Sequence, residues 1–311
     1  MISKVLVTGA NGFVGRALCA HLEQSGCAVV RAVRSTDSPF EFPVGAIDGA
    51  TPWGPALGTG VDAVVHLAAQ AALADQSPAA LARLRVLNVE GTANLARQCA
   101  AHGVQRLVFV STAKVLGEGR EQPYGADDSP LPADPYARSK WEAEQGLLQI
   151  AAQTGLEVVI IRPPLVYGPG VKGNFAALMR WVARGRVLPL GAITHNARSL
   201  LALDNLVDLV MHCAVHPAAA NQTFLVADGE DVSTAELLQR MARAMNRKAR
   251  LFPVPVWMLE SAAALLGKRD VARRLCGSLR LDIQHTRQRL GWTPPIGLDE
   301  GLRRAAQGLK R

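Results

Sequence analysis

Short apolar runs alternate with helical patterns along the first half of this chain, and that alternation is the strongest limit on its fold. The apolar runs that read as strands are Val5–Val7, Ala28–Val33, Val61–Leu67, Arg106–Ser111 and Glu157–Arg162. Patterns typical of helices lie between them, over 14–24, 79–102 and 135–153. Continuous Val, Ile and Leu runs joined by helices indicate a parallel sheet that helices cover on both faces. The sequence therefore predicts an α/β fold with a doubly wound parallel sheet.

The texture of the sequence changes beyond Pro163. A turn-rich segment at 163–170 is followed by mainly helical sequence with short strands such as Thr223–Val226. A chain of 311 residues is long enough for two lobes that each bury a core. We expect a dinucleotide-binding domain over 1–165, to which 196–228 return, and a smaller, partly interleaved C-terminal lobe over mainly 166–311 that binds substrate.

Composition narrows the partners. Lys and Arg number 34 against 26 Asp and Glu, a formal net charge of +8, but no basic block occurs and aromatic residues are only 5%. Scattered basic residues suit a small anionic ligand better than a nucleic acid, so no nucleic-acid partner is expected. The five cysteines lie far apart without a C-x-x-C pair, which predicts neither a disulfide framework nor a metal site.

No part of the sequence predicts insertion into a membrane. The most apolar later stretch, Leu251–Leu266, is interrupted by Pro253, Pro255 and Glu260. No apolar run reaches the roughly 18 residues that a span requires. The first residues run straight into a strand pattern and lack a signal peptide. A cytoplasmic protein is expected.

A glycine-rich loop lies directly between the first strand and the first helix, over Thr8–Gly15. Gly9 permits a tight turn, Gly12 lets the backbone approach a pyrophosphate, and Gly15 lets the helix pack on the sheet. Amide groups at the helix N-terminus would then face the phosphates. We predict a Rossmann-type dinucleotide site that includes Gly9, Asn11, Gly12, Phe13, Val14 and Gly15.

The residues that follow the second strand bear on the choice of cofactor. An acidic residue there would hold the ribose diol of NAD. This chain instead has Val33, Arg34 and Ser35. Arg34 can pair with a 2′-phosphate, or it is a solvated surface residue. NADP(H) is therefore favoured over NAD(H), which stays possible.

Three residues form the predicted catalytic group. Tyr136 and Lys140 are four residues apart and thus share one face of a helix. A nearby ammonium is expected to lower the pKa of the phenol. Ser111 and Thr112 end a strand, where hydroxyls point into the crevice at the carboxyl edge of the sheet. We predict Thr112, Tyr136 and Lys140 as catalytic residues.

With these motifs together, the chain resembles the extended short-chain dehydrogenase/reductase family, in its nucleotide-sugar branch of UDP-glucose 4-epimerase-like and UDP-4-keto-6-deoxy-N-acetylhexosamine 4-reductase-like proteins. The G-x-x-G-x-x-G spacing is that of the family. The matching segments span nearly the whole chain: 8–15, 66–69, 88–92, 110–118, 136–140, 162–168, 173–175, 198–199 and 290–294.

The resemblance implies a role for each matching residue. Tyr136 would be the acid/base, and Lys140 would assist it and hold the nicotinamide ribose. Thr112, with Ser111 alongside, would bind the sugar oxygen at C4. The substrate residues would be Ser111, Thr112, Tyr136, Asn174 and Phe175 at the nucleoside diphosphate, and Arg198 at a phosphate. Further cofactor contacts are expected at Asp48 near the end of the third strand, and at Leu67, Ala68, Ala69, Asn88, Ser111, Tyr136, Lys140, Pro163 and Leu165.

Departures from the family narrow the reaction. Ala113 and Lys114 stand where sugar dehydratases carry an acid pair, and Ala113 stands where the fucose-synthase type carries a cysteine. What remains is 4-epimerisation with retained NAD, or 4-keto reduction in bacterial polysaccharide precursor synthesis. The missing acid after the second strand favours reduction of a UDP-linked hexose or N-acetylhexosamine.

Other classes of function stay open at this point. A cofactor-sensing regulator would usually have lost the Tyr136/Lys140 pair, and a dehydrogenase of steroid-like alcohols would not need Asn174, Phe175 and Arg198. The resemblance also implies a homodimer. Its contact would be a bundle of the helices at 79–102 and 135–153, whose small residues permit close approach: Ala93, Ala96, Ala100 and Ala143.

Overall fold

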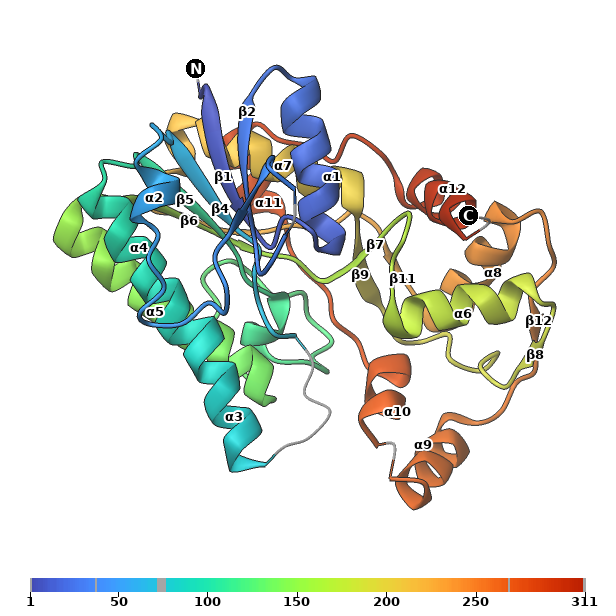
Figure 1. The fold of residues 1–311 in the computed structure, drawn as a ribbon. Helices are drawn as coiled ribbons and strands as arrows, with labels where there is room; N and C mark the ends of the chain where they lie inside the picture. Colours follow the sequence, from blue (N-terminus) through green and yellow to red (C-terminus); the bar gives the residue numbers. More distant parts are fainter. Residues whose placement is uncertain (1, 37, 72–76, 268, 310–311) are drawn as a thin grey trace.

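The computed structural model describes residues 2–36, 38–71, 77–267 and 269–309. Its centre is a seven-stranded parallel sheet in the order β10-β6-β5-β4-β1-β2-β3 (Figure 1). These strands are β1 (Lys4–Thr8), β2 (Ala28–Val33), β3 (Glu41–Pro43), β4 (Ala63–His66), β5 (Arg106–Val110), β6 (Glu157–Arg162) and β10 (Thr223–Leu225). β1 lies between β2 and β4. Strands β2 and β3 are added on one side of β1, and β4, β5 and β6 on the other side. The predicted doubly wound parallel sheet is confirmed.

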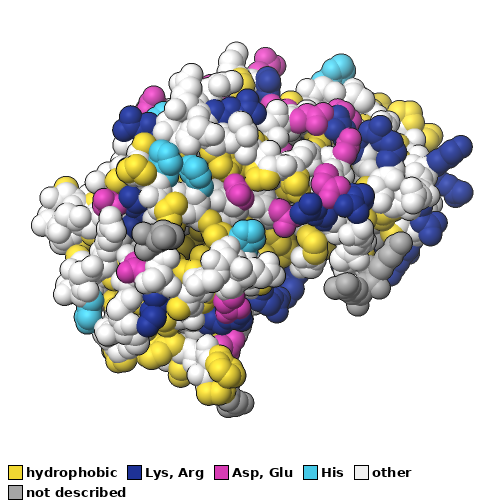
Figure 2. Space-filling view, turned by 90° about the horizontal axis from the view of Figure 1, so that it is seen from above, with side chains coloured by type: hydrophobic (Ala, Val, Ile, Leu, Met, Phe, Trp, Pro, Cys, Tyr) yellow, Lys and Arg dark blue, Asp and Glu magenta, His cyan; other side chains and the backbone are white. Residues whose placement is uncertain are grey.

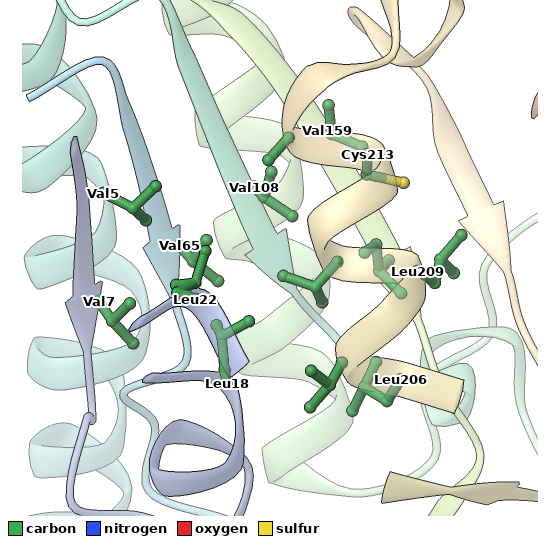
Figure 3. Close-up of a cluster of buried hydrophobic side chains, with 14 of the residues drawn as sticks. Val5, Val7, Leu18, Leu22, Val65, Val108, Val159, Leu206, Leu209 and Cys213 are labelled. Atoms are coloured by element: carbon green, nitrogen blue, oxygen red, sulfur yellow. The ribbon is translucent and has the colours of Figure 1, made fainter. Parts of the chain in front are cut away.

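Helices cover both faces of this sheet, which explains why its strands are apolar without alternation. On one face, α1 (Phe13–Gln24) and α7 (Leu203–Val215) pack Leu18, Leu22, Leu206 and Leu209 against strand residues such as Val65 (Figure 3). The opposite face is covered by α2 (Gly54–Leu57), α4 (Thr92–Ala101) and α5 (Pro135–Thr154).

The helical stretch predicted over 79–102 has three parts. It consists of α3 (Pro78–Arg85), a π-helical turn η1 (Val86–Gly91) and α4. At Gly91 the backbone lies so close to the neighbouring loop that a Cβ would be 2.6 Å from Cγ2 of Ile47. The widened turn occurs where the helix passes that loop, and such turns often lie at functional sites.

The alanines predicted to line a contact between two copies have a different partner. Ala96 and Ala143 are buried in the core beneath α4 and α5, which lie side by side in Figure 1. Ala93 and Ala100 pack against the same core. The prediction was wrong for Ala96 and Ala143, because their small side chains let two helices of one chain approach each other and the sheet. For the half-buried Ala93 and Ala100 it stays a prediction.

A second lobe is built around its own core. Its strands are β7 (Leu165–Tyr167), β9 (Arg198–Ala202) and β11 (Asp231–Val232) in one sheet, and β8 (Val187–Leu188) and β12 (Arg250–Leu251) in another. Its helices are α6 (Gly173–Ala183), α8 (Thr234–Ala244), α9 (Val256–Leu265), α10 (Arg269–Cys276) and α12 (Leu298–Gly308). The remaining elements are α11 (Gln284–Leu290) and the 3₁₀ turns η2 (Ala113–Leu116) and η3 (Pro217–Ala219). Across the described ranges, every helix is too short or too polar to traverse a bilayer.

Candidate active site

The glycine loop joins β1 to α1 and has the shape of an anion cradle. Gly9 adopts a φ of +66°, and the Gly12 N–H donates to the Gly9 carbonyl at 2.9 Å. A Cβ at Gly15 would lie 2.2 Å from the same carbonyl oxygen, so only glycine fits there. No side chain caps α1 at Gly12, which leaves its first N–H groups to bind an anion. Asn11 is exposed and Phe13 and Val14 are half-buried beside it. The loop fits a pyrophosphate.

A hydrogen-bonded chain holds the neighbouring loop against the glycines. Thr8 Oγ1 lies 2.7 Å from His66 Nδ1 and accepts from the N–H groups of Leu67 and Ala68 at 3.1 and 3.2 Å. His66 Nε2 lies 2.9 Å from Thr92 Oγ1. Burial lowers the pKa of His66 to about 3, so this ring is neutral. His66 therefore has a structural role, and it places the segment Leu67–Ala69 beside Gly9.

Asn88 contacts this loop from the π-helical turn. Its amide is buried, donates to the Gln70 carbonyl at 3.1 Å and to Ser139 Oγ at 2.9 Å, and accepts from the Gln70 N–H at 2.9 Å. The sequence predicted a direct cofactor contact. Asn88 holds the Leu67–Gln70 loop against α5, and its direct cofactor contact stays a prediction.

Two further cofactor candidates lie at the carboxyl edge of the sheet. Arg34 is exposed directly after β2. Asp48 lies five residues beyond the end of β3 rather than at its end. Its carboxylate accepts from the Ala50 N–H at 2.8 Å and from Thr51 Oγ1 at 3.1 Å, and these bonds lower its pKa. The Asp48 side chain is thus engaged in its own turn.

Tyr136 and Lys140 lie on the first turns of α5. Asp134 caps this helix by accepting from the Ala137 N–H at 2.7 Å, and Pro135 starts it. Burial raises the pKa of Tyr136 to about 12, and the Asp134 carboxylate adds to the effect. The predicted lowering of this pKa by Lys140 was wrong, because desolvation of the phenolate dominates.

Lys140 is itself almost wholly buried, with 1% of its surface exposed. Burial lowers its pKa to about 7, and Glu144 acts against that shift. Its Nζ lies 4.0 Å from the centroid of the Phe109 ring, in cation–π geometry. At neutral pH the ammonium and the amine are therefore both populated.

Glu144 connects the residues around Lys140. It lies one turn further along α5, fully buried, and forms an ion pair with Arg162 at 2.6 Å. The Ser111 hydroxyl donates to the other carboxylate oxygen. Ser111 was expected to face cofactor and substrate, but its hydroxyl points to Glu144. The sequence analysis missed Glu144, although its spacing of four residues from Lys140 was a usable signal.

Thr112 ends the loop after β5 and caps the turn η2. Its Oγ1 accepts from the Lys114 N–H at 3.3 Å. A hydroxyl has one proton to donate besides its lone pairs. The proton of Thr112 thus stays available to an oxygen in the adjoining cavity.

That cavity has a volume of about 530 Å³ and is lined by both lobes. It brings together six residues that the sequence predicted: Thr112, Tyr136, Leu165, Asn174, Phe175 and Arg198. Pro164 lines it in place of Pro163, whose carbonyl accepts from the Ala113 N–H at 2.8 Å. The ring of Phe175 stacks on Tyr167 with centroids 5.2 Å apart, so it forms a fixed wall.

The charge of the cavity favours an anion. Among the residues that the structure describes, one carboxylate lines it, that of Glu118, against four cationic side chains: Lys114, Lys172, Arg198 and Arg274. Lys114 also pairs with Asp134 at 2.9 Å. Arg198 donates to the Gly277 carbonyl at 2.9 Å, which fixes its guanidinium. Sequence reasoning did not anticipate Arg274, which comes from a distant helix and has no local motif.

Comparison with known proteins places this geometry in context. Residues 5–227 match the family described as the NAD dependent epimerase/dehydratase family. A UDP-glucose 4-epimerase of Vibrio cholerae is 46% identical over 315 residues, covering 99% of this chain and 95% of that protein. An N-acetyl-alpha-D-glucosaminyl-diphospho-ditrans,octacis-undecaprenol 4-epimerase of Escherichia coli O157:H7 is 28% identical, covering 99% and 95%. The solved structure of MoeE5 in complex with UDP-glucose and NAD is 27% identical with a TM-score of 0.80, covering 99% of both chains.

Proposed function

Because this chain belongs to the NAD dependent epimerase/dehydratase family, we propose that it interconverts a UDP-hexose or UDP-N-acetylhexosamine with its 4-epimer. The carrying observation is that Thr112 and Tyr136 line one cavity and that Ala113 and Lys114 directly follow Thr112. Dehydration needs an acid and a base at 113 and 114, and 4-epimerisation does not. The relationship to a UDP-glucose 4-epimerase supports epimerisation over the 4-keto reduction that the sequence favoured.

The enzyme is of the nucleotide-sugar type and uses a nicotinamide dinucleotide. Gly9, Gly12 and the N-terminus of α1 would hold its pyrophosphate, with Leu67–Ala69 alongside. Bound there, a nicotinamide dinucleotide would supply the acceptor and donor of a hydride at C4. We propose that this half of the site is 1–165 with α7 and β10 of the returning segment 196–228, and that mainly 166–311, including β9 with Arg198, serves the substrate.

Protons at the sugar oxygen are the task of Tyr136 and Thr112. A phenol whose pKa is about 12 carries its proton near pH 7, which is the form that donates to a C4 carbonyl oxygen. In the opposite direction the phenolate accepts the C4 hydroxyl proton. Thr112 can donate to the same oxygen, because its Oγ1 only accepts a hydrogen bond from the Lys114 N–H and its hydroxyl proton is left to donate. In its ammonium form Lys140 would act against the desolvation that raises the pKa of Tyr136.

The second lobe supplies recognition of the diphosphate. Arg198 and Arg274 project charge into the cavity, where phosphate oxygens can accept charge-assisted hydrogen bonds. Apolar side chains of α6, among them Phe175 and Trp181, offer a surface for the base.

The test is incubation of the purified enzyme with UDP-glucose, UDP-N-acetylglucosamine and a UDP-4-keto-6-deoxy sugar, each with and without NADPH, read by NMR and mass. We expect 4-epimers to form without net consumption of reductant. A gain of two hydrogens on the keto sugar, without epimerisation, would instead establish the reductase.

The role of Tyr136 has its own test. Tyr136→Phe should lower turnover by about 100-fold or more and leave dinucleotide binding intact. Tyr124→Phe is the matched control, because Tyr124 is also buried but does not line the cavity. Activity of Tyr136→Phe at the original rate would exclude the mechanism.

Reduction with NADPH is the second candidate, and Arg34 is the observation that favours it. The preference for NADP(H) stays a prediction. Arg34→Ala should then lower the affinity for NADPH by about ten- to a hundredfold, which is the contribution of a charge-assisted hydrogen bond. The affinity for NADH should stay unchanged. Equal affinities of the original enzyme for the two dinucleotides would contradict it.

We also propose that the enzyme is a cytoplasmic homodimer whose contact uses the outer faces of α3, η1 and α5. Val86 and Leu148 are exposed on those elements. Sedimentation velocity at micromolar concentration should give a dimer, and a monomer would contradict the assembly.

A further inference from the structure

The helix α9 exposes a large apolar surface in the second lobe. No residue of this helix is buried. Trp257 is 67% exposed and Leu265 is 90% exposed, and Phe252 and Leu266 flank the helix with 60% and 71% exposed. Single exposed apolar residues are ordinary, whereas a contiguous apolar patch marks a contact surface.

The apolar residues of α9 form one continuous face. Its outward side combines Trp257, Met258, Ser261, Ala262 and Leu265, all exposed and spaced as one stripe of a helix. The Ser261 hydroxyl donates to the Trp257 carbonyl at 2.8 Å, so its polar group already has a partner. Val256 and Leu259 point the other way and pack on the core of the lobe. The helix is thus anchored to the protein by one face and presents the other.

Basic residues flank α9 in the sequence. The segment 243–274 contains eight Lys and Arg residues against Glu260 and Asp270, a net +6 out of the +8 of the whole chain. Arg250 precedes α9 and Arg269 follows it, both with exposed side chains. Figure 2 views the molecule from above and shows Lys and Arg side chains at the end where the second lobe lies, whereas α9, at the bottom of Figure 1, is on the far side of that view.

We propose that α9 and the residues next to it dock on an anionic phospholipid membrane. A helix of ten residues is about 15 Å long, too short to cross a bilayer, but it can lie in the interface. An interfacial helix needs Trp and Leu on the face that enters the lipid, and Lys and Arg beside that face. The basic residues attract the anionic headgroups.

A second copy of the chain fits this surface less well than a membrane does. In a two-fold contact the same patch meets itself, so Arg250 and Arg269 of one protomer would meet the same residues of its partner. A lipid surface supplies the opposite charge and an apolar layer together. This inference does not rest on the proposed reaction, although α10, which follows α9, also lines the candidate cavity through Val271, Arg274 and Leu275.

The experiment is flotation of the full-length protein with vesicles of phosphatidylcholine and phosphatidylglycerol in equal parts, compared with pure phosphatidylcholine. We expect the protein to float with the anionic vesicles only. Trp257→Ser combined with Leu265→Ser should weaken the partition by about tenfold or more. Arg250→Gln combined with Arg269→Gln should weaken it by about fivefold for each charge removed.

Phe40→Ser is the matched control, because Phe40 is 84% exposed on the other lobe, and it should leave the partition unchanged. Circular dichroism and turnover should be unaltered in all variants, since none of these residues lines the cavity. Absence of binding to anionic vesicles would overturn the proposal. So would equal losses in Phe40→Ser, or conversion of a dimer to a monomer by the α9 variant, which would make this face a contact between copies.

Discussion

Glu144 is the residue on which the buried charges near Lys140 depend. It is fully buried, and Arg162, its ion-pair partner, has only 6% of its side chain exposed. Glu144→Gln leaves Arg162 charged and without a counter-ion. Breaking a buried pair in this way costs about 3–5 kcal/mol, much more than an exposed pair contributes.

We expect Glu144→Gln to lower the free energy of urea unfolding by that amount and to lower the pKa of Lys140 further. Glu142→Gln is the matched control. Glu142 lies on the same helix as Glu144, and it pairs at the surface of the protein with Arg85 of α3. Its effect should stay below about 1 kcal/mol. Equal effects of the two variants would contradict a special role for Glu144.

The sequence identified Tyr136 and Lys140 but not their protonation. A spacing of four residues on a helix was sufficient to place both side chains on one face. The pKa values of Tyr136 and Lys140 depend on burial. That burial comes from β5, β6 and the second lobe, so it cannot be predicted from the sequence around Tyr136. The hydrogen bond from Ser111 to Glu144 was missed for the same reason, because Glu144 reaches Ser111 from another element.

At the scale of elements, the contact between β1 and α1 depends on one missing side chain. A Cβ at Gly15 would lie 2.2 Å from the Gly9 carbonyl and 2.8 Å from Ala10 Cα. Gly15→Ala must therefore push α1 away from the sheet. We expect a loss of a few kcal/mol in unfolding free energy, about 1–3 for an overpacked site, together with loss of dinucleotide binding.

Gly146 in α5 provides a comparison, because an alanine there should raise the free energy of unfolding rather than lower it. No atom lies within 4 Å of the Cβ that Gly146→Ala would add. Alanine favours a helix interior by about 0.5–1 kcal/mol over glycine, so this variant should be more stable. Urea unfolding of both variants is the measurement, and a stable Gly15→Ala protein that still binds the dinucleotide would refute the packing argument.

Elements with continuous apolar patterns could be predicted, and their packing partners could not. The predicted strand 157–162 and the helix over 135–153 differ from β6 and α5 by at most one residue. The predicted contact of Ala96 and Ala143 with a second copy was wrong, because composition does not show which neighbour a helix face with small side chains packs against. Arg274 joins Arg198 in the cavity only through the fold of the second lobe.

The stability of the whole molecule should depend on pH through His66. Its pKa is about 3 in the folded protein against 6.5 as the reference value, so between these pH values only the unfolded chain binds the proton. Unfolding free energy then falls as pH is lowered, by about 1.4 kcal/mol per pH unit. From about pH 6.5 to pH 5, above the range in which most carboxylates titrate, we expect a loss of about 2 kcal/mol.

Urea unfolding across that pH range measures this slope. His66→Gln should reduce it, because the variant has no imidazole to exclude from protonation. The exposed His195 provides the control, since His195→Gln should leave the slope of the original protein. An unchanged slope in His66→Gln would show that other groups govern the pH dependence.

The position of β10 also determines the order in which the molecule can be completed during synthesis. β10 pairs with β6 in register Thr223↔Ile160, so the outer edge of β6 waits for a segment about 60 residues further along the chain. A ribosome adding about 5–20 residues per second takes roughly 3–12 s to supply it. During that interval the apolar run Val158–Ile161 presents an open strand edge to every other nascent chain nearby. Crowded polysomes therefore favour aggregation through this open edge, and slower initiation of translation should raise the soluble yield of the protein.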